Sequence, residues 1–164
     1  MLTLTLLASL SLAADPAPAA DGGDVVASRV IRAPADTLFD KLVDPKVAST
    51  YAPDRCMRKW TFDPSQTKDA DFRVVYLMEL FRRKLTASVQ KADRPRRFEW
   101  NHHGNKGFIT RFSFDEVEAG TEVTVHTYIA VPPKPLQRYY RNKVQPRWVE
   151  CYDGFLDAVA ESVE

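Results

Sequence analysis

Hydrophobic and polar residues alternate with the period of a β-strand in the first patterned stretch of the chain, residues 25–33. The alternation ends at Pro34. From Ala35 to Pro45 the apolar residues instead recur three and four positions apart, which is the spacing of one helical face. These apolar residues are Leu38, Phe39, Leu42 and Val43. The pattern therefore predicts a strand that leads directly into a short amphipathic helix.

The period of two returns after a second short helix, which we expect over residues 46–51. Each predicted strand has apolar residues on one face only, and polar turns separate neighbouring strands. Strands of this kind form antiparallel sheets that place one face against a core. We expect about six of them, over residues 58–62, 72–80, 84–90, 98–100, 108–114 and 121–130.

Prolines end the predicted sheet, and helical spacing follows. The apolar residues of the last segment lie on one face of a helix, with charged residues opposite, and Pro146 fits its first turn. Residues 136–143 form either a separate short helix or a kinked extension of it. The apolar face consists of Trp148, Val149, Tyr152, Phe155, Leu156, Val159 and Val163.

Three stretches of the chain resemble the START-like, or SRPBCC, superfamily, which includes Bet v 1 and polyketide cyclase/dehydrase-type proteins. They are the opening over residues 25–45, the turn KADRPRRFEW at 91–100, and GTEVTV at 120–125. The resemblance extends from Asp24 to the end of the sequence. It implies an α+β helix-grip fold, in which a curved antiparallel β-sheet wraps a long C-terminal α-helix and leaves a ligand cavity between them.

The length of 164 residues and the balanced charge fit one globular domain. Lys and Arg total 23 against 22 Asp and Glu, so the net charge of +1 indicates no nucleic acid partner. The oligomeric state does not follow from the sequence. Basic residues cluster locally, which indicates solvated turns and a helix face or, alternatively, peripheral contact with an anionic membrane. The clusters are Arg82, Arg83 and Lys84; Arg94, Arg96 and Arg97; and Arg138, Arg141, Lys143 and Arg147.

The first residues predict export. An apolar stretch too short to span a bilayer precedes an Ala/Pro/Asp/Gly-rich segment, although no Lys or Arg comes before it. We interpret residues 1–13 as a signal peptide, residues 14–23 as a spacer and residues 24–164 as the START-like domain. Cleavage is expected after Ala13, with Ala19 as the second choice, and the mature protein is expected to be periplasmic or secreted.

Two cysteines, Cys56 and Cys151, allow two interpretations. In an oxidising compartment they can form a disulfide. Alternatively, they are two buried thiols that act as small apolar residues. The distance between their Cα atoms decides between these, and the sequence does not contain it.

The sequence contains no recognisable catalytic or metal-binding motif. The adjacent residues His102 and His103 would point to opposite faces of a strand, so they cannot share a metal there. His102 lies beside a glycine turn, where a solvent-facing side chain is the default and a cavity position the alternative. No serine elbow, phosphate loop or dinucleotide fingerprint occurs. We therefore predict no catalytic residues, no metal and no cofactor.

The aromatic content of the predicted inner surface is the main functional signal. Rigid apolar rings with a few hydroxyl groups suit a hydrophobic ligand that is oriented by few hydrogen bonds. For any single ring, plain core packing is the favoured interpretation, because a small domain also needs aromatic side chains to fill the space between sheet and helix. Inward hydroxyls are the more telling positions, because a buried hydroxyl needs a partner. The candidate ligand-binding residues are Tyr76, Met78, Trp100, Thr110, Phe112, Thr127, Trp148, Tyr152 and Phe155.

Three functional hypotheses follow. The first is an exported, noncatalytic protein that holds a hydrophobic small molecule or lipid between the sheet and the last helix, and it rests partly on fold analogy. The second is an enzyme that resembles the aromatase/cyclases and positions a polyketide-like substrate. The third is a protein or membrane-surface interaction module that uses the basic surface.

Overall fold

The computed structural model describes residues 24–62, 72–78, 81–103, 108–129 and 133–163, with backbone only for residues 59, 61–62, 72–78 and 81–84. The predicted signal peptide, the spacer, and the turn at 104–107 lie outside the described residues. The elements are β1 Val25–Ile31, α1 Ala35–Val43, α2 Pro45–Ala48, η1 Ser49–Tyr51, β2 Met57–Phe62, β3 Phe72–Met78, β4 Phe81–Asp93, β5 Arg97–His103, β6 Ile109–Val117, β7 Gly120–Tyr128, α3 Lys134–Tyr139, η2 Tyr140–Val144 and α4 Gln145–Glu161.

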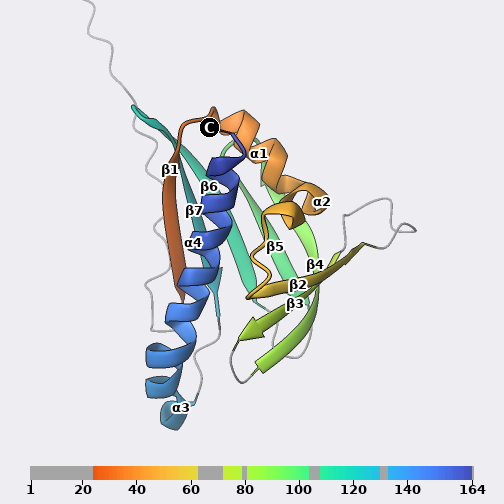
Figure 1. The fold of residues 1–164 in the computed structure, drawn as a ribbon, viewed down its shortest axis with the longest axis vertical. Coiled ribbons are helices and arrows are strands. Elements are labelled where there is room, and N and C mark those ends of the chain that lie inside the picture. Colours follow the sequence, from red (N-terminus) through yellow and green to blue (C-terminus); the bar gives the residue numbers. More distant parts are fainter. Residues whose placement is uncertain (1–23, 63–71, 79–80, 104–107, 130–132, 164) are drawn as a thin grey trace, which may run out of the picture.

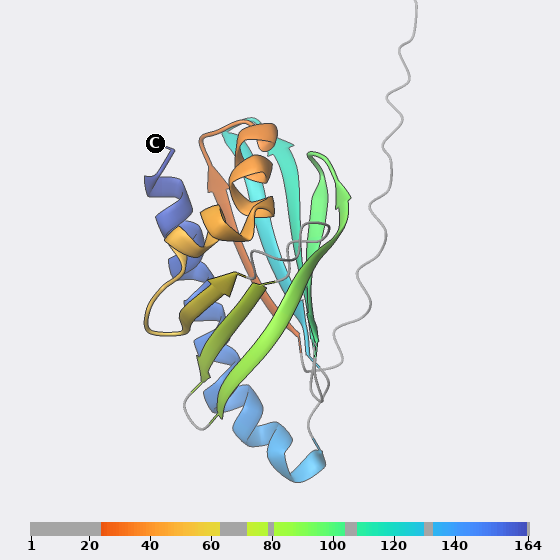
Figure 2. The same ribbon diagram turned by 90° about the vertical axis from the view of Figure 1, so that its right-hand side faces the viewer.

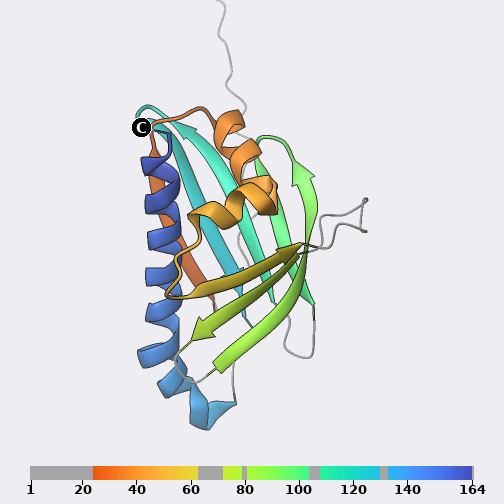
Figure 3. The same ribbon diagram turned by 45° about the vertical axis from the view of Figure 1, so that its right-hand side comes forward.

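The described strands form one seven-stranded antiparallel sheet in the order β1-β7-β6-β5-β4-β3-β2. The sheet curves, and α4 lies along its concave side while α1 and α2 cross one end (Figures 1 and 2). In Figure 3, β2, β3 and β4 run across toward α4. This arrangement confirms the α+β helix-grip fold that the sequence predicts.

Alternation along the strands produces the two faces of the sheet. The face toward α4, here called the inner face, carries the buried residues of β5, β6 and β7 except Glu99, and the intervening residues form the outer face. β1 departs from strict alternation at Arg29, which is exposed although its neighbours Ala27 and Ile31 on that face are buried. Its guanidinium forms an ion pair with Asp157 of α4, so this position links the edge strand to the helix.

The turn between β6 and β7 explains the glycine of the GTEVTV motif. Gly120 has φ +139°, a conformation that residues with a Cβ rarely adopt. A Cβ on this residue would also overlap the carbonyl oxygen of Ile31 at the end of β1. The glycine is therefore a structural requirement for bringing β7 beside β1.

The C-terminal helical segment is continuous. The π turn η2 connects α3 directly to α4, so residues 136–143 belong to an irregular extension of the long helix and not to a separate one. A π turn widens the helix locally. Pro146 lies in the first turn of α4, as the sequence predicts.

A disulfide joins Cys56, which precedes β2, to Cys151 in the middle of α4, with 6.0 Å between the Cα atoms. The two cysteines are 95 residues apart in sequence. The bond therefore connects the β2 edge of the sheet to the helix, whereas the Arg29–Asp157 pair connects α4 to the opposite edge strand, β1.

Replacing both cysteines with alanine is expected to lower the free energy of unfolding by about 4 to 5 kcal/mol, because a loop of this length restricts the unfolded chain strongly. Urea denaturation of the oxidised wild-type protein and the Cys56→Ala/Cys151→Ala variant measures the difference. A loss below about 1 kcal/mol would show that the bond contributes little to stability.

Candidate functional site

Strand register places two threonines side by side in the middle of the inner face. Thr110 of β6 lies opposite Thr127 of β7 on one side and opposite Trp100 of β5 on the other. Both threonine side chains are fully buried, and Tyr152 of α4, also fully buried, lies against them. The sheet and the helix therefore bring three hydroxyl groups together inside the protein.

The three hydroxyls form a closed triangle of hydrogen bonds. Thr127 Oγ1 donates to Tyr152 OH at 2.9 Å, and Thr110 Oγ1 lies 3.0 Å from Thr127 Oγ1 and 3.2 Å from Tyr152 OH. Each hydroxyl has one proton and two lone pairs, so the triangle satisfies its own donors. Thr127 Oγ1 donates to Tyr152 and accepts at most one bond, from Thr110, so one of its lone pairs remains for a further donor. The triangle can accept a hydrogen bond from a further donor without losing any of its own.

His102 extends this polar cluster. Its side chain is 2% exposed, its Nε2 lies 3.5 Å from Thr110 Oγ1, and its ring lies 4.2 Å from that of Phe108. The default expectation of a solvent-facing His102 is wrong. β5 continues to residue 103, beyond the predicted strand end at residue 100, and this keeps His102 on the inner face with Trp100.

The neighbouring histidine confirms the alternation. His103 is exposed on the outer face, where its Nε2 lies 2.9 Å from Ser88 Oγ. The two rings therefore point to opposite sides of the sheet, as the sequence predicts. Continuing the period of two from Trp100 through the histidines was the signal that could have placed His102 correctly.

Burial controls the charge of His102. Desolvation, followed by repulsion from His103, lowers the pKa of His102 from 6.5 to about 3. The ring is therefore neutral at physiological pH. A general base is most effective when its pKa lies near the working pH, so His102 is poorly suited to accept a proton from a substrate.

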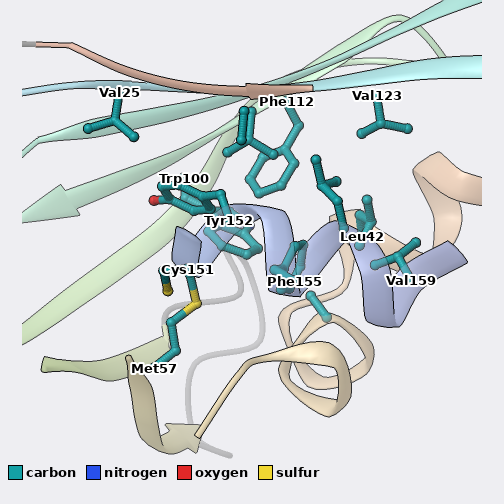
Figure 4. Close-up of a cluster of buried hydrophobic side chains, with 14 of the residues drawn as sticks. Val25, Leu42, Met57, Trp100, Phe112, Val123, Cys151, Tyr152, Phe155 and Val159 are labelled. Carbon is teal, nitrogen blue, oxygen red and sulfur yellow. The ribbon is translucent and has the colours of Figure 1, made fainter. Parts of the chain in front are cut away.

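Aromatic rings surround the hydroxyl triangle. The centroid of the Trp100 ring lies 4.5 Å from that of Phe112 and 6.2 Å from that of Phe155, and Trp148 stacks on Tyr152 at 5.8 Å. Figure 4 shows Trp100 and Phe112 facing Tyr152 and Phe155 across the space between the sheet and α4. The rings make contact with one another there, so they also form part of the core.

Seven of the nine candidate ligand-binding residues lie together in this region, each 4% exposed or less: Trp100, Thr110, Phe112, Thr127, Trp148, Tyr152 and Phe155. The other two, Tyr76 and Met78, belong to β3, whose side chains lie outside the described part of the structure. The sequence did not single out Phe98, whose fully buried ring stacks on Phe112 at 4.7 Å.

Acidic residues take no part in the described portion of this inner cluster. Glu99 is the one buried carboxylate among the described residues, and it lies on the outer face, where Arg111 Nη2 at 2.8 Å and Lys91 Nζ at 3.3 Å pair with it. Within the described ranges, no group of His, Cys, Asp or Glu is suited to hold a metal ion. The same ranges contain no helix long and apolar enough to cross a membrane.

The buried His102 should make stability depend on pH. The unfolded state takes up a proton near pH 6.5 and the folded state only near pH 3, so protons favour unfolding between these values and stability falls as the pH is lowered. The contribution approaches about 1.4 kcal/mol per pH unit. His102→Gln should remove it.

Urea denaturation between neutral and acidic pH measures this slope. The exposed His103→Gln variant is the matched control and should retain most of the wild-type slope, because His103 contributes only the smaller cause of the shift. Equal slopes in the wild-type protein and His102→Gln would contradict the burial of a neutral ring.

Comparisons with known proteins agree with this geometry. The model of a family described as "Polyketide cyclase / dehydrase and lipid transport" matches residues 23–164. No curated protein matches the chain significantly.

Solved structures share the fold. The chain is similar to TTHA0849 from Thermus thermophilus, with a TM-score of 0.69, 16% identity, and coverage of 84% of this chain and 94% of that one. It is similar to CV1439 from Chromobacterium violaceum, with a TM-score of 0.62, 12% identity, and coverage of 87% and 98%. It is also similar to the di-domain ARO/CYC StfQ from the steffimycin biosynthetic pathway, with a TM-score of 0.64, 9% identity, and coverage of 85% and 50%. At these identities the likeness shows a common fold alone.

Proposed function

The chain belongs to the polyketide cyclase/dehydrase and lipid transport family, and from this premise we propose that it is an exported, noncatalytic protein that binds a hydrophobic small molecule or lipid between the sheet and α4. Its membership also confirms the predicted SRPBCC, or Bet v 1-like, superfamily. The observation that carries the proposal is the hydroxyl triangle of Thr110, Thr127 and Tyr152, fully buried among aromatic rings.

The aromatic surroundings favour an apolar ligand. Moving apolar surface out of water stabilises a complex by about 25 cal/mol per Å², without any directional contact. Trp100, Phe112 and Phe155 present rigid ring surfaces toward the same region, and few polar groups interrupt them. The sequence also assigns Tyr76 and Met78 of β3 to this binding site, and their inclusion remains part of the proposal.

The hydroxyl triangle favours a ligand with one hydrogen-bond donor. The remaining lone pair of Thr127 can accept such a bond, and a hydrocarbon chain can occupy the apolar surroundings. A hydroxylated lipid or a phenolic compound has this combination of features. The triangle thereby sets the orientation of the ligand, while the rings supply most of the affinity.

A noncatalytic role agrees with the chemistry of the inner face. His102 has a low pKa, and the described residues place no carboxylate beside it, so the described site offers little to stabilise a charged transition state. The alternative is an aromatase/cyclase-like enzyme. The description of the family, which names polyketide cyclases and dehydrases, favours this alternative. Native mass spectrometry distinguishes the carrier from the enzyme. A carrier should copurify with an unmodified apolar molecule, whereas purification without a bound molecule would favour the enzyme.

Export is part of the proposal and has two supports. The apolar stretch at residues 1–13 has the character of a signal peptide. The disulfide between Cys56 and Cys151 fits an oxidising compartment, the periplasm or the extracellular space, because cytosolic proteins rarely retain such bonds.

The mature protein should bind an environment-sensitive fluorescent fatty alcohol saturably. Tyr152→Phe keeps the ring and removes one hydroxyl of the triangle, so we expect affinity for the alcohol to fall about fivefold to tenfold, while affinity for a matched hydrocarbon probe is retained. Fluorescence titration measures both affinities.

Tyr128→Phe is the matched control, because its hydroxyl accepts a hydrogen bond from Arg111 on the outer face and should not affect binding. Circular dichroism verifies folding. A folded protein without saturable binding of either probe would contradict the carrier function.

Expression of the full sequence in a Gram-negative host should yield a periplasmic protein that begins at Ala14 or, as the second choice, Ala20. Intact mass spectrometry of the periplasmic fraction measures the processing. Retention of Met1 in a cytosolic protein would contradict export. It would not contradict ligand binding, which the fluorescence titration tests separately.

A further inference from the structure

The helical segment formed by α3 and η2 extends beyond the end of the sheet (Figures 1 and 3). Residues 133–149 contain no Asp or Glu. They contain five basic residues, all of them exposed: Lys134, Arg138, Arg141, Lys143 and Arg147. We call the exposed basic residues of this segment, together with Leu136, the helical tip.

The apolar stripe of the C-terminal helix continues into the helical tip. Tyr140, Val144 and Trp148 recur every four residues and are buried, with exposures of 8%, 8% and 4%. Leu136 lies one further step along the same spacing, but beyond the body of the protein, and it is 52% exposed. A large apolar side chain is therefore left at the surface among cations, next to the half-buried Tyr139.

The cations of the helical tip differ from another basic cluster of the chain. Arg94 pairs with Asp36 at 2.9 Å and with Asp40 at 2.8 Å, so α1 neutralises it. Among the described residues, no carboxylate pairs with Lys134, Arg138, Arg141 or Lys143. The positive charge of these four residues is thus available for an external anion.

We propose that the helical tip is a docking surface for an anionic lipid membrane. Clustered Lys and Arg residues are attracted to the negative surface of such a membrane, and an exposed leucine beside a tyrosine suits insertion at the boundary between headgroups and acyl chains. A nucleic acid would use the cations but not Leu136, and the pI of about 7.8 is low for a nucleic acid-binding domain. This docking proposal does not require that a ligand binds at the hydroxyl triangle.

Vesicle sedimentation tests the proposal. The mature protein should bind vesicles that contain phosphatidylglycerol, bind pure phosphatidylcholine vesicles much more weakly, and dissociate at high salt. The variant Arg138→Gln/Arg141→Gln/Lys143→Gln should bind the anionic vesicles on the order of 100-fold more weakly. Leu136→Gln should weaken binding about fivefold, with the charge unchanged.

The control variant Arg32→Gln/Lys46→Gln/Arg96→Gln removes the same charge from exposed positions near α1 and α2, and should bind within about threefold of the wild-type protein. Equal losses in both triple variants would overturn the proposal, because net charge alone would then explain binding. Tighter binding to duplex DNA than to the anionic vesicles would also overturn it. If circular dichroism shows that Arg138→Gln/Arg141→Gln/Lys143→Gln is unfolded, the test uses the two remaining measurements. The proposal is then overturned if high salt does not weaken binding of the wild-type protein and Leu136→Gln binds the anionic vesicles as tightly as the wild-type protein.

Discussion

The packing of α4 against the concave face of the sheet is the interaction on which the rest of the structure depends. Tyr152 and Phe155 are fully buried in this interface, and Trp148 nearly so. The position of the helix determines where the Tyr152 hydroxyl lies relative to the two threonines of the sheet. The disulfide at Cys151 holds that position toward the β2 edge, and the half-exposed ion pair of Asp157 with Arg29 of β1 adds a weaker connection at the opposite edge. The geometry of the candidate site is thus a direct consequence of how the helix is held.

A polar triangle inside an aromatic core has a clear energetic logic. A buried hydroxyl without a partner would cost stability, and the three hydroxyls avoid this cost by bonding to one another. The remaining lone pair of Thr127 lies in a region of low dielectric constant, where a further hydrogen bond is strong. The neutral His102 beside Thr110 keeps the region uncharged, which suits an apolar ligand better than a charged substrate.

Much of this arrangement could be predicted from the sequence, because it depends on local periodicity. The alternation along β6 and β7 places Thr110 and Thr127 on the inner face, and the helical spacing places Tyr152 on the buried side of α4. Properties that depend on distances between remote segments could not be predicted. The sequence leaves the disulfide undecided because the Cα separation of Cys56 and Cys151 is set by tertiary packing. The sequence misplaces His102 because the glycine turn predicts an earlier strand end than the structure has, where His102 pairs with Ala87 of β4 and its backbone N–H donates to the carbonyl of Phe108.

Threonine methyl groups offer the most direct test of the central claim, that a ligand binds against the hydroxyl triangle between the sheet and α4. Selective methyl labelling allows NMR titration of the mature protein with a fatty alcohol. The account predicts saturable shifts at the methyl groups of Thr110 and Thr127. It predicts none at Thr124, which lies on the outer face of β7, the strand that also contains Thr127. Shifts confined to Thr124, or saturable binding that leaves Thr110 and Thr127 unchanged, would contradict the account.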